Sequence, residues 1–360
     1  MSWILAFLGF AVLIILHELG HFAVAKAVGM RVERFSLFFP PLVLRRQGKG
    51  ETEYAIGAIP LGGYVKISGM NPHEELPPGQ EHRAYFRQPV WKRIAVIVAG
   101  PVVNIVLAAV ILTFFFSANG TPRPGAEVVR VQADLPANGV LQAGDVITSV
   151  DGKTGSSRDL SDQIATHRCE GGLADGCKAK TPAELVVRRD GRTERISISP
   201  VYDADEGRMR LGFIQTTPVK DVGLIGAAGA SADEMWRITS VTVSTIGQVL
   251  FDAEKRKEVS GVVGSYETTR QAVQLNFDTA MYVLALISLS LGVINLFPFL
   301  PLDGGHIFWA LAEKVRGRAI PFSVMERAGF VGFALVAVLF FIGLTNDLDR
   351  LAGDGFNLGR

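Results

Sequence analysis

The sequence predicts an α-helical membrane protein with four transmembrane helices and one inserted β-rich domain. Of its 360 residues 48% are hydrophobic, and these residues gather in four long stretches. Each stretch approaches the ~20 residues that a helix needs to cross a bilayer. The net charge of +1 excludes a general electrostatic affinity for nucleic acid. Two cysteines are too few for a disulfide-rich scaffold.

The four predicted transmembrane helices occupy residues 1–30, 94–117, 281–302 and 328–345. The first could also be read as a signal peptide, but no positive charge precedes its apolar stretch, and ionisable residues interrupt it. We therefore interpret it as an uncleaved span. Near the end of the third stretch, Pro298 and Pro301 cannot continue a regular helix, so the sequence predicts a break in the backbone there.

Positive charge predicts how the chain is oriented. The connection at residues 31–93 holds ten Lys and Arg residues, the connection between the third and fourth spans holds four, and none precedes the first span. Short loops rich in Lys and Arg stay in the cytoplasm. Both connections are therefore predicted to be cytoplasmic, and both termini and the long insert are predicted to lie outside.

The insert between the second and third spans predicts a small β-rich domain at residues 122–215. Alternating apolar residues mark strands, Asp190-Gly191 is typical of a hairpin turn, and a short helix fits residues 160–167. The predicted strands lie at 126–132, 144–153, 183–189 and 193–199. Cys169 and Cys177 could form a bridge in an oxidising compartment or remain free thiols, and the sequence leaves both open.

Residues 224–252 predict an amphipathic helix on the outer membrane surface. Apolar residues alternate with Asp233, Glu234 and Arg237, so the first half is too polar to span a bilayer comfortably. A fifth span is the competing interpretation, but it would break the topology that the charges predict.

The strongest chemical signal is His17-Glu18-Leu19-Gly20-His21 within the first span. Residues i and i+4 share one face of a helix, so both imidazoles can bind one zinc ion, with Glu18 beside them as a base. The motif could arise by chance in a soluble helix. Inside a membrane span, however, three ionisable residues are costly unless something such as a metal compensates them.

A catalytic zinc site usually has three protein ligands, and the third must also lie at membrane depth. Asp303 follows the predicted break in the third span, where irregular backbone can turn a side chain toward the first helix. His306 is an alternative ligand, although a role in capping or orienting the turn suits it better.

These motifs together resemble the site-2 protease family of intramembrane zinc metalloproteases, in particular the bacterial branch that regulates the sigma-E envelope stress response. The resemblance implies one Zn²⁺ per chain, bound by His17, His21 and Asp303, with Glu18 as the residue that activates water. It also implies that Asn295 positions substrate or stabilises the developing oxyanion.

Three further stretches resemble parts of this family. Residues 122–215 are similar to a PDZ domain of the bacterial protease type, and residues 51–68 are similar to the family's membrane-dipping β-hairpin. This similarity suggests that Gly62, Gly63 and Tyr64 contact substrate through an exposed strand edge. Asn104 ends a further matching motif, Ala-Gly-Pro-Val-Val-Asn. It is a candidate substrate-binding residue, or it forms a bond to a neighbouring segment.

The chain departs from the resemblance in two places. The insert has room for one PDZ-like domain where well-known members of this branch carry two, and Val262 stands where the family usually has proline.

The resemblance leads us to expect a multi-pass protein of the bacterial cytoplasmic (inner) membrane, with both termini and the PDZ-like domain in the periplasm. We expect an endopeptidase that cleaves single-span membrane proteins, such as anti-sigma factors or signal-peptide remnants, after a site-1 protease has shortened them. One alternative is a non-proteolytic PDZ scaffold with a structural metal, which would not need the base Glu18. Another is a zinc transporter, but the sequence shows no internal repeat.

Overall fold

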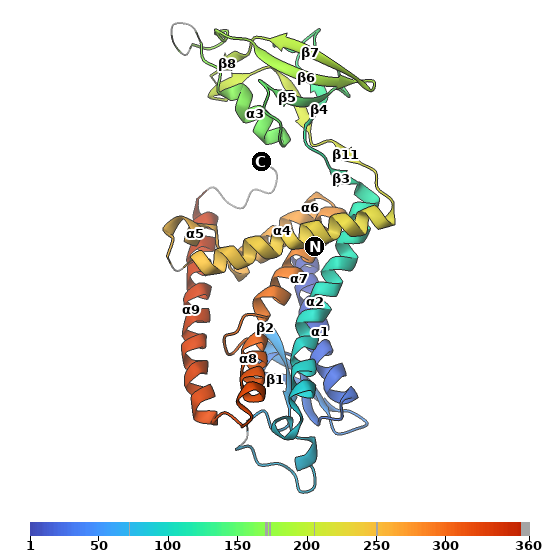
Figure 1. Ribbon diagram of the computed structural model, residues 1–360, viewed down its shortest axis with the longest axis vertical. Coiled ribbons are helices and arrows are strands. Elements are labelled where there is room, and N and C mark those ends of the chain that lie inside the picture. The colour runs from blue at the N-terminus through green and yellow to red at the C-terminus, as the bar shows by residue number, and fades with distance from the viewer. Residues whose placement is uncertain (72, 170–171, 173, 205, 250, 354–360) are drawn as a thin grey trace. The chain divides into compact units, whose positions relative to one another are not determined.

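Among the residues that this computed structural model describes, four helices are long and apolar enough to cross a membrane, which confirms the four predicted spans (Figure 1). They are α1 (Ser2–Ala27), α2 (Val90–Asn119), α7 (Phe277–Asn295) and α9 (Phe322–Ala352). The structure describes residues 1–353 except 72, 170–171, 173, 205 and 250. The chain forms two units, one of Met1–Phe115 with Ala228–Arg360 and one of Phe116–Ala227.

The third span is shorter than the predicted 281–302, because α7 ends at Asn295. The predicted break follows it, and a new helix, α8 (Asp303–Arg316), begins at Asp303. Gly304 and Gly305 of α8 lie against the backbone of the preceding loop, where a Cβ on Gly305 would lie 2.5 Å from the Leu300 nitrogen. The chain therefore turns sharply between the two helices, and Asp303 starts the second.

The β-hairpin is longer than the predicted residues 51–68. That stretch corresponds to one strand, β2 (Glu53–Ile67), and its partner is β1 (Val32–Gln47), which the sequence analysis left without a structure. The Pro40-Pro41 pair within β1 argues against a strand, because proline cannot donate to a ladder. The structure accommodates the prolines with register shifts between Leu37 and Leu42.

Two 3₁₀ turns, η1 (Glu81–Arg83) and η2 (Tyr85–Arg87), follow the hairpin and lead into α2. The Tyr85 amide donates to the Ser68 carbonyl (2.8 Å), so this connection packs back against the end of β2. Tyr85 also joins a buried cluster with Met30, Val32 and Val96, which joins the hairpin to α1 and α2.

The second unit contains a five-stranded antiparallel sheet with the order β10-β4-β5-β6-β7. The predicted strands, the helix and the Asp190-Gly191 turn are all present, and the core includes Val128, Ile147 and Leu160. The sheet strands are β4 (Ala126–Val131), β5 (Val146–Val150), β6 (Ala183–Arg189), β7 (Arg192–Ile198) and β10 (Phe213–Thr216). The helix of this unit is α3 (Ser157–Ala165).

Two smaller strand pairs complete this unit. β8 (Val201–Asp203) pairs with β9 (Arg208–Arg210), and β3 (Thr121–Pro122) pairs with β11 (Val219–Lys220). The second pair brings the start and the end of the insert together. Cys169 and Cys177 form a disulfide, so the bridge is the correct one of the two alternatives that the sequence left open.

The predicted amphipathic helix is α4 (Leu224–Gln248), which ends before the predicted residue 252; residue 250 lies outside the described residues. It is not one of the four helices suited to crossing a membrane within the described part of the chain. Two helices that the sequence analysis did not assign follow, α5 (Ala253–Glu258) and α6 (Val262–Leu275).

Helix α6 forms hydrogen bonds with both α1 and α9. The Tyr266 hydroxyl donates to the Trp3 carbonyl at 2.8 Å. The buried carboxylate of Asp347 in α9 accepts from the amides of Gly261 (3.1 Å) and Gly264 (2.7 Å), which caps the start of α6. These glycine contacts are present although Val262 replaces the proline that is usual in the resembled family.

Candidate metal centre

Two buried imidazoles of α1 form one side of the candidate metal centre. His17 and His21 lie one helical turn apart, each is 7% exposed, and their Nε2 atoms are 3.3 Å apart. The Nδ1–H of His21 donates to the Val96 carbonyl of α2 at 2.8 Å. This bond fixes the ring and leaves Nε2 with a lone pair, the arrangement that metal-binding histidines commonly have.

Asp303 completes a triangle of donor atoms. Its Oδ2 lies 3.3 Å from the Nε2 of His17 and 3.3 Å from the Nε2 of His21. Two ligands of one tetrahedral zinc ion, each bonded at ~2.0–2.1 Å, lie roughly 3.3 Å apart. The three donors therefore have the spacing that zinc requires, and they come from helices far apart in the sequence.

The chemistry of the three donors also fits a cation. Asp303 Oδ2 is buried and has no hydrogen-bond donor among the described residues. Lone pairs that face one another in a buried site are unfavourable unless a cation or a proton lies between them. His306, the alternative ligand, lies one turn further along α8 and is not part of this group.

Helix α2 supplies no ligand but makes room for two of them. A Cβ at Gly100 would collide with the Nε2 of His21 and lie 2.9 Å from the Nε2 of His17. At Gly20 of α1, a Cβ would lie 2.6 Å from the Ala99 carbonyl oxygen. The two helices can therefore approach closely only because both positions are glycine. Gly100 is not among the predicted site residues, although it lies in the same Ala-Gly-Pro-Val-Val-Asn stretch as Asn104.

Glu18 lies beside the ligands and against the hairpin. A Cβ at Gly63 of β2 would lie 3.0 Å from the Glu18 Cγ. The two neighbouring residues that were predicted to contact substrate have other partners. Gly62 faces the Phe39 ring, and the Tyr64 ring stacks on the Phe39 ring with centroids 6.3 Å apart. The structure therefore brings Gly63 to the candidate base, while Gly62 and Tyr64 lie next to it along the strand.

The two asparagines that the sequence predicted for the site, Asn104 and Asn295, lie on α2 and α7. Asn295 is the last residue of α7 and is half-buried. Asn104 is fully buried, and its side-chain amide has no hydrogen-bond partner among the described residues. Its link to the neighbouring helix runs instead through its backbone carbonyl, which accepts from the Ser288 hydroxyl at 3.0 Å. Asn104 therefore bonds α7 through its backbone, and its role toward substrate stays a prediction.

Ion pairs brace the other end of the hairpin. Lys66 of β2 lies 2.7 Å from Glu33 of β1 and 2.8 Å from Glu74 of the following loop. Burial alone would raise the pKa of Glu33, but its hydrogen bonds with Lys66 and Ser68 hold that pKa below its usual range. The carboxylate is therefore ionised at neutral pH, and the pairs join both strands to the loop before α2.

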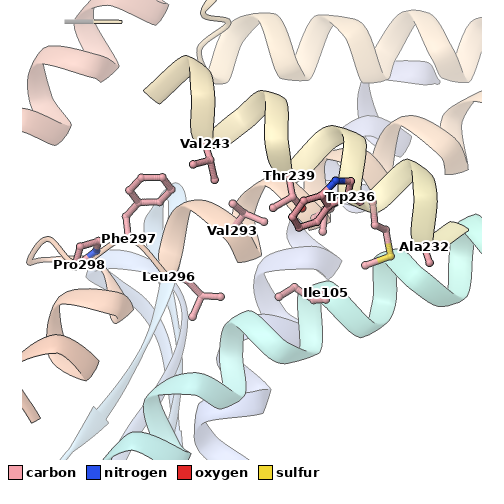
Figure 2. Close-up of a pocket in the computed structure, with 11 residues that line it drawn as sticks. Ile105, Ala232, Trp236, Thr239, Val243, Val293, Leu296, Phe297 and Pro298 are labelled. Atoms are coloured by element: carbon pink, nitrogen blue, oxygen red, sulfur yellow. The ribbon is translucent and has the colours of Figure 1, made fainter. Parts of the chain in front are cut away.

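An apolar groove of about 600 Å³ lies under α4, next to the loop that leads to Asp303 (Figure 2). Its walls come from α2, α4, α7 and the loop, and include Ile105, Trp236, Val243, Val293, Leu296 and Phe297. The Tyr282 hydroxyl of α7 donates to Glu234 of α4 at 2.6 Å, which joins two of the helices that form the groove. An apolar surface thus extends toward the segment that carries the third ligand.

Comparison with known proteins gives matches along most of the chain. The model of Peptidase family M50 matches residues 5–339. A protein of Clostridium acetobutylicum named "Putative zinc metalloprotease" is 29% identical over 96% of both chains. A protein of the same name from Nostoc sp. is 31% identical over 93% of both chains. Among solved structures, the PDZ domain of an SdrC-like protein from Listeria innocua covers 26% of this chain and 96% of its own, with 25% identity and a TM-score of 0.22.

Proposed function

Because this chain belongs to Peptidase family M50, the site-2 protease family of membrane zinc metalloproteases, we propose that it cleaves single-span membrane proteins within or near the bilayer. The observation that carries the proposal is the triangle of His17, His21 and Asp303, whose donor atoms have the spacing of zinc ligands. Two of its donors lie on α1, which is suited to crossing a membrane, and Asp303 starts the helix that follows α7 after a short loop.

The residues around the triangle suit hydrolysis of a peptide bond. A zinc ion held by His17, His21 and Asp303 would supply Lewis-acid activation of water. Glu18 adjoins His17 in the chain and offers a carboxylate that takes a proton from the attacking water and passes it to the leaving nitrogen. The amide of Asn295 is the proposed donor toward the developing oxyanion or the substrate backbone.

The hairpin and the groove support an extended, apolar substrate. A transmembrane helix has to unwind before hydrolysis, and its freed backbone groups then need partners. We propose that the β2 edge at Gly62, Gly63 and Tyr64 supplies them beside Glu18. Phe39, Val43 and Leu44 of β1 are exposed apolar side chains, which suits a hairpin that dips into the membrane. The groove under α4 offers further apolar surface for the uncleaved part of a substrate helix.

We also propose the orientation and the compartment. The eight Lys and Arg residues between α1 and α2, together with Lys92 and Arg93 at the start of α2, favour the cytoplasmic side for that connection, so the β-rich unit and both termini would be periplasmic in a bacterial inner membrane. Residues 354–360, which include the C-terminus, lie outside the described residues. The Cys169–Cys177 disulfide suits this oxidising compartment. Anti-sigma factors and signal-peptide remnants, shortened by a site-1 protease, are the proposed substrates.

The experiment that tests this function is co-expression with candidate single-span proteins, followed by a search for a fragment that depends on Glu18. Glu18→Gln keeps the shape of the side chain but cannot accept a proton, so we expect cleavage to fall by roughly 10²- to 10⁴-fold. Zinc should remain bound, measured on the purified protein. Glu254→Gln, on the exposed face of α5, is the matched control and should cleave normally.

The same experiment separates the rival functions. A zinc-loaded scaffold would bind partners without producing a fragment in either form. A transporter would move zinc into vesicles, and the fragment would again be missing. Near-normal cleavage by Glu18→Gln would refute the proposed role of Glu18 even if the protein is a protease.

For the β-rich unit we propose a PDZ-like domain that acts mainly as a size filter and secondarily as a peptide-binding site. Substrates with large outer domains would be refused until another protease trims them. The β3–β11 pair closes the base of this unit, so removing residues 124–217 and joining the ends with a flexible linker leaves that pair in place. We expect the deletion variant to cleave full-length substrate. Continued refusal by a folded, zinc-loaded variant would contradict the filter, and loss of trimmed-substrate cleavage would favour peptide binding.

A further inference from the structure

Helix α2 contacts both parts of the candidate metal centre. Two donors come from α1 and the third from α8. One face of α2 contacts both, because positions 93, 96 and 100 are spaced by three and four residues and lie on the same side of the helix. The Val96 carbonyl accepts the hydrogen bond from His21, and Gly100 leaves space for both imidazoles because it has no side chain. Arg93, at the start of this face, is the residue that reaches α8.

The contact between Arg93 and α8 is a bidentate ion pair. The Nη1 of Arg93 lies 3.0 Å from Glu313 Oε2, and its Nη2 lies 2.6 Å from Glu313 Oε1. The side chains are 10% and 27% exposed, so water screens the pair only weakly. Two parallel N–H···O bonds between planar groups fix an angle as well as a distance. The pair therefore fixes the position of α8 along its own axis relative to α2, and its rotation about that axis.

This ion pair acts on the same helix that begins with Asp303. Ten residues separate Asp303 from Glu313, about 15 Å at ~1.5 Å per residue. Between them, Ile307 packs against the buried cluster that holds Val96 and Tyr85. The Arg93 guanidinium lies over the Tyr85 ring, 6.0 Å from the ring centroid. A rigid α8 held at its far end in this way presents Asp303 to the imidazoles in one position.

We propose that Arg93 and Glu313 are positioning residues for the metal centre: their ion pair fixes α8 on α2 and thereby sets the distance and angle at which Asp303 meets His17 and His21. Neither residue is one of the three donors. The inference rests on Asp303 as a metal ligand. It differs from a general stabilising role, because it requires changes at this pair to alter how the metal is held while the protein remains folded.

The test uses the full-length protein in detergent or lipid and two conservative variants. Arg93→Lys keeps the charge but loses the planar fork, and Glu313→Asp keeps the carboxylate but shortens its reach. We expect zinc to transfer to a chelator roughly tenfold faster in both, within the range known for residues that support metal ligands. With cobalt in place of zinc, we expect the visible absorption bands to shift. Cleavage should show a lower kcat with little change in KM.

The matched control is the Asp145–Arg189 pair of the β-rich unit, which is also bidentate (2.7 and 2.6 Å) but lies outside the metal centre. Arg189→Lys and Asp145→Glu should leave zinc transfer and the cobalt spectrum unchanged. The exchanged pair, Arg93→Glu with Glu313→Arg, should restore slow zinc transfer relative to either single change, even if a single reversal fails to fold.

Unchanged zinc transfer and cobalt bands in folded Arg93→Lys and Glu313→Asp would overturn the proposal. Equal changes in the control variants would also overturn it, because the effect would then be general. Asp303→Asn is measured alongside. If that variant keeps zinc as tightly as the unaltered protein, the ligand assignment itself fails, which is a different result from failure of the positioning pair.

Discussion

Gly63 and Glu18 approach each other so closely that any side chain on Gly63 would meet the candidate base. A Cβ there would lie 3.0 Å from the Glu18 Cγ, 3.0 Å from the Ser36 carbonyl oxygen and 3.3 Å from the Ile14 Cγ2. One of these neighbours is backbone, so the strand cannot simply shift away. The hairpin and the first helix are therefore fitted to each other at the residue that the proposed chemistry needs.

Gly63→Ala is expected to lower cleavage roughly 10- to 100-fold, because small displacements of a catalytic group are costly. Zinc content should stay unchanged, since no metal ligand is touched. Gly50→Ala is the control, because a Cβ at Gly50 meets no atom within 4 Å. Normal cleavage by Gly63→Ala would show that Glu18 does not depend on this contact.

Asp303→Asn removes a negative charge from the donor triangle, and we expect zinc affinity and cleavage to fall by roughly 10- to 100-fold or more. His306→Ala should keep both, because His306 lies outside the group of donors. Metal analysis of the two purified variants checks this. The reverse pattern, with zinc retained by Asp303→Asn and lost by His306→Ala, would mean that the wrong residue of α8 was chosen.

Gly100→Ala is expected to abolish stable zinc binding, because the new Cβ would collide with the His21 imidazole and crowd that of His17. Gly229→Ala in α4 provides a matched change in a helix, since a Cβ there meets nothing within 4 Å. The measurement is zinc per chain, together with the thermal transition to show that the variant is folded. A folded Gly100→Ala with full zinc would contradict the close packing of α2 on the ligands.

The stability of the β-rich unit is expected to fall in acid because of Asp145. Burial alone would raise the pKa of this carboxylate, but the bonds from Arg189 and from the Gln142 amide outweigh burial and hold the pKa below its usual range. A lowered pKa contributes stability above the unfolded value near ~3.9, and this contribution is lost as the pH falls through the folded value.

Asp145→Asn should therefore destabilise the β-rich unit at pH 7 by about 1–3 kcal/mol and reduce its further loss of stability between pH 5 and pH 2. Hydrogen exchange of the strand amides at 126–216 in the intact protein measures both effects. Asp162→Asn, an exposed acid on α3, serves as the control. Identical pH profiles for the unaltered protein and Asp145→Asn would refute this account.

The sequence predicted the features that depend on local pattern. The spans follow from apolar length, the break before Asp303 from Pro298 and Pro301, and the pair of imidazoles from the spacing of four. Asp303 could be predicted because it is an acid placed directly after the break, at the start of α8.

Other features depend on contacts between distant parts of the chain and left no pattern to read. Strand β1 contains Pro40-Pro41, which argues against a strand, and its pairing with β2 overrides that preference. The role of Gly100 appears only when α1 packs against it. Arg93 and Glu313 lie far apart in the sequence, so nothing in their spacing predicts that they form a pair.

The positions of the three metal donors have a consequence for how the protein is made. Asp303 is translated 282 residues after His21. Two imidazoles alone are fewer than the three ligands that a catalytic zinc site usually has. A nascent chain that has inserted its first two spans therefore has no complete metal centre, and α8 must be synthesised and docked before hydrolysis can begin. With the proposed ligand set, the order of translation thus prevents proteolysis before α8 has been made.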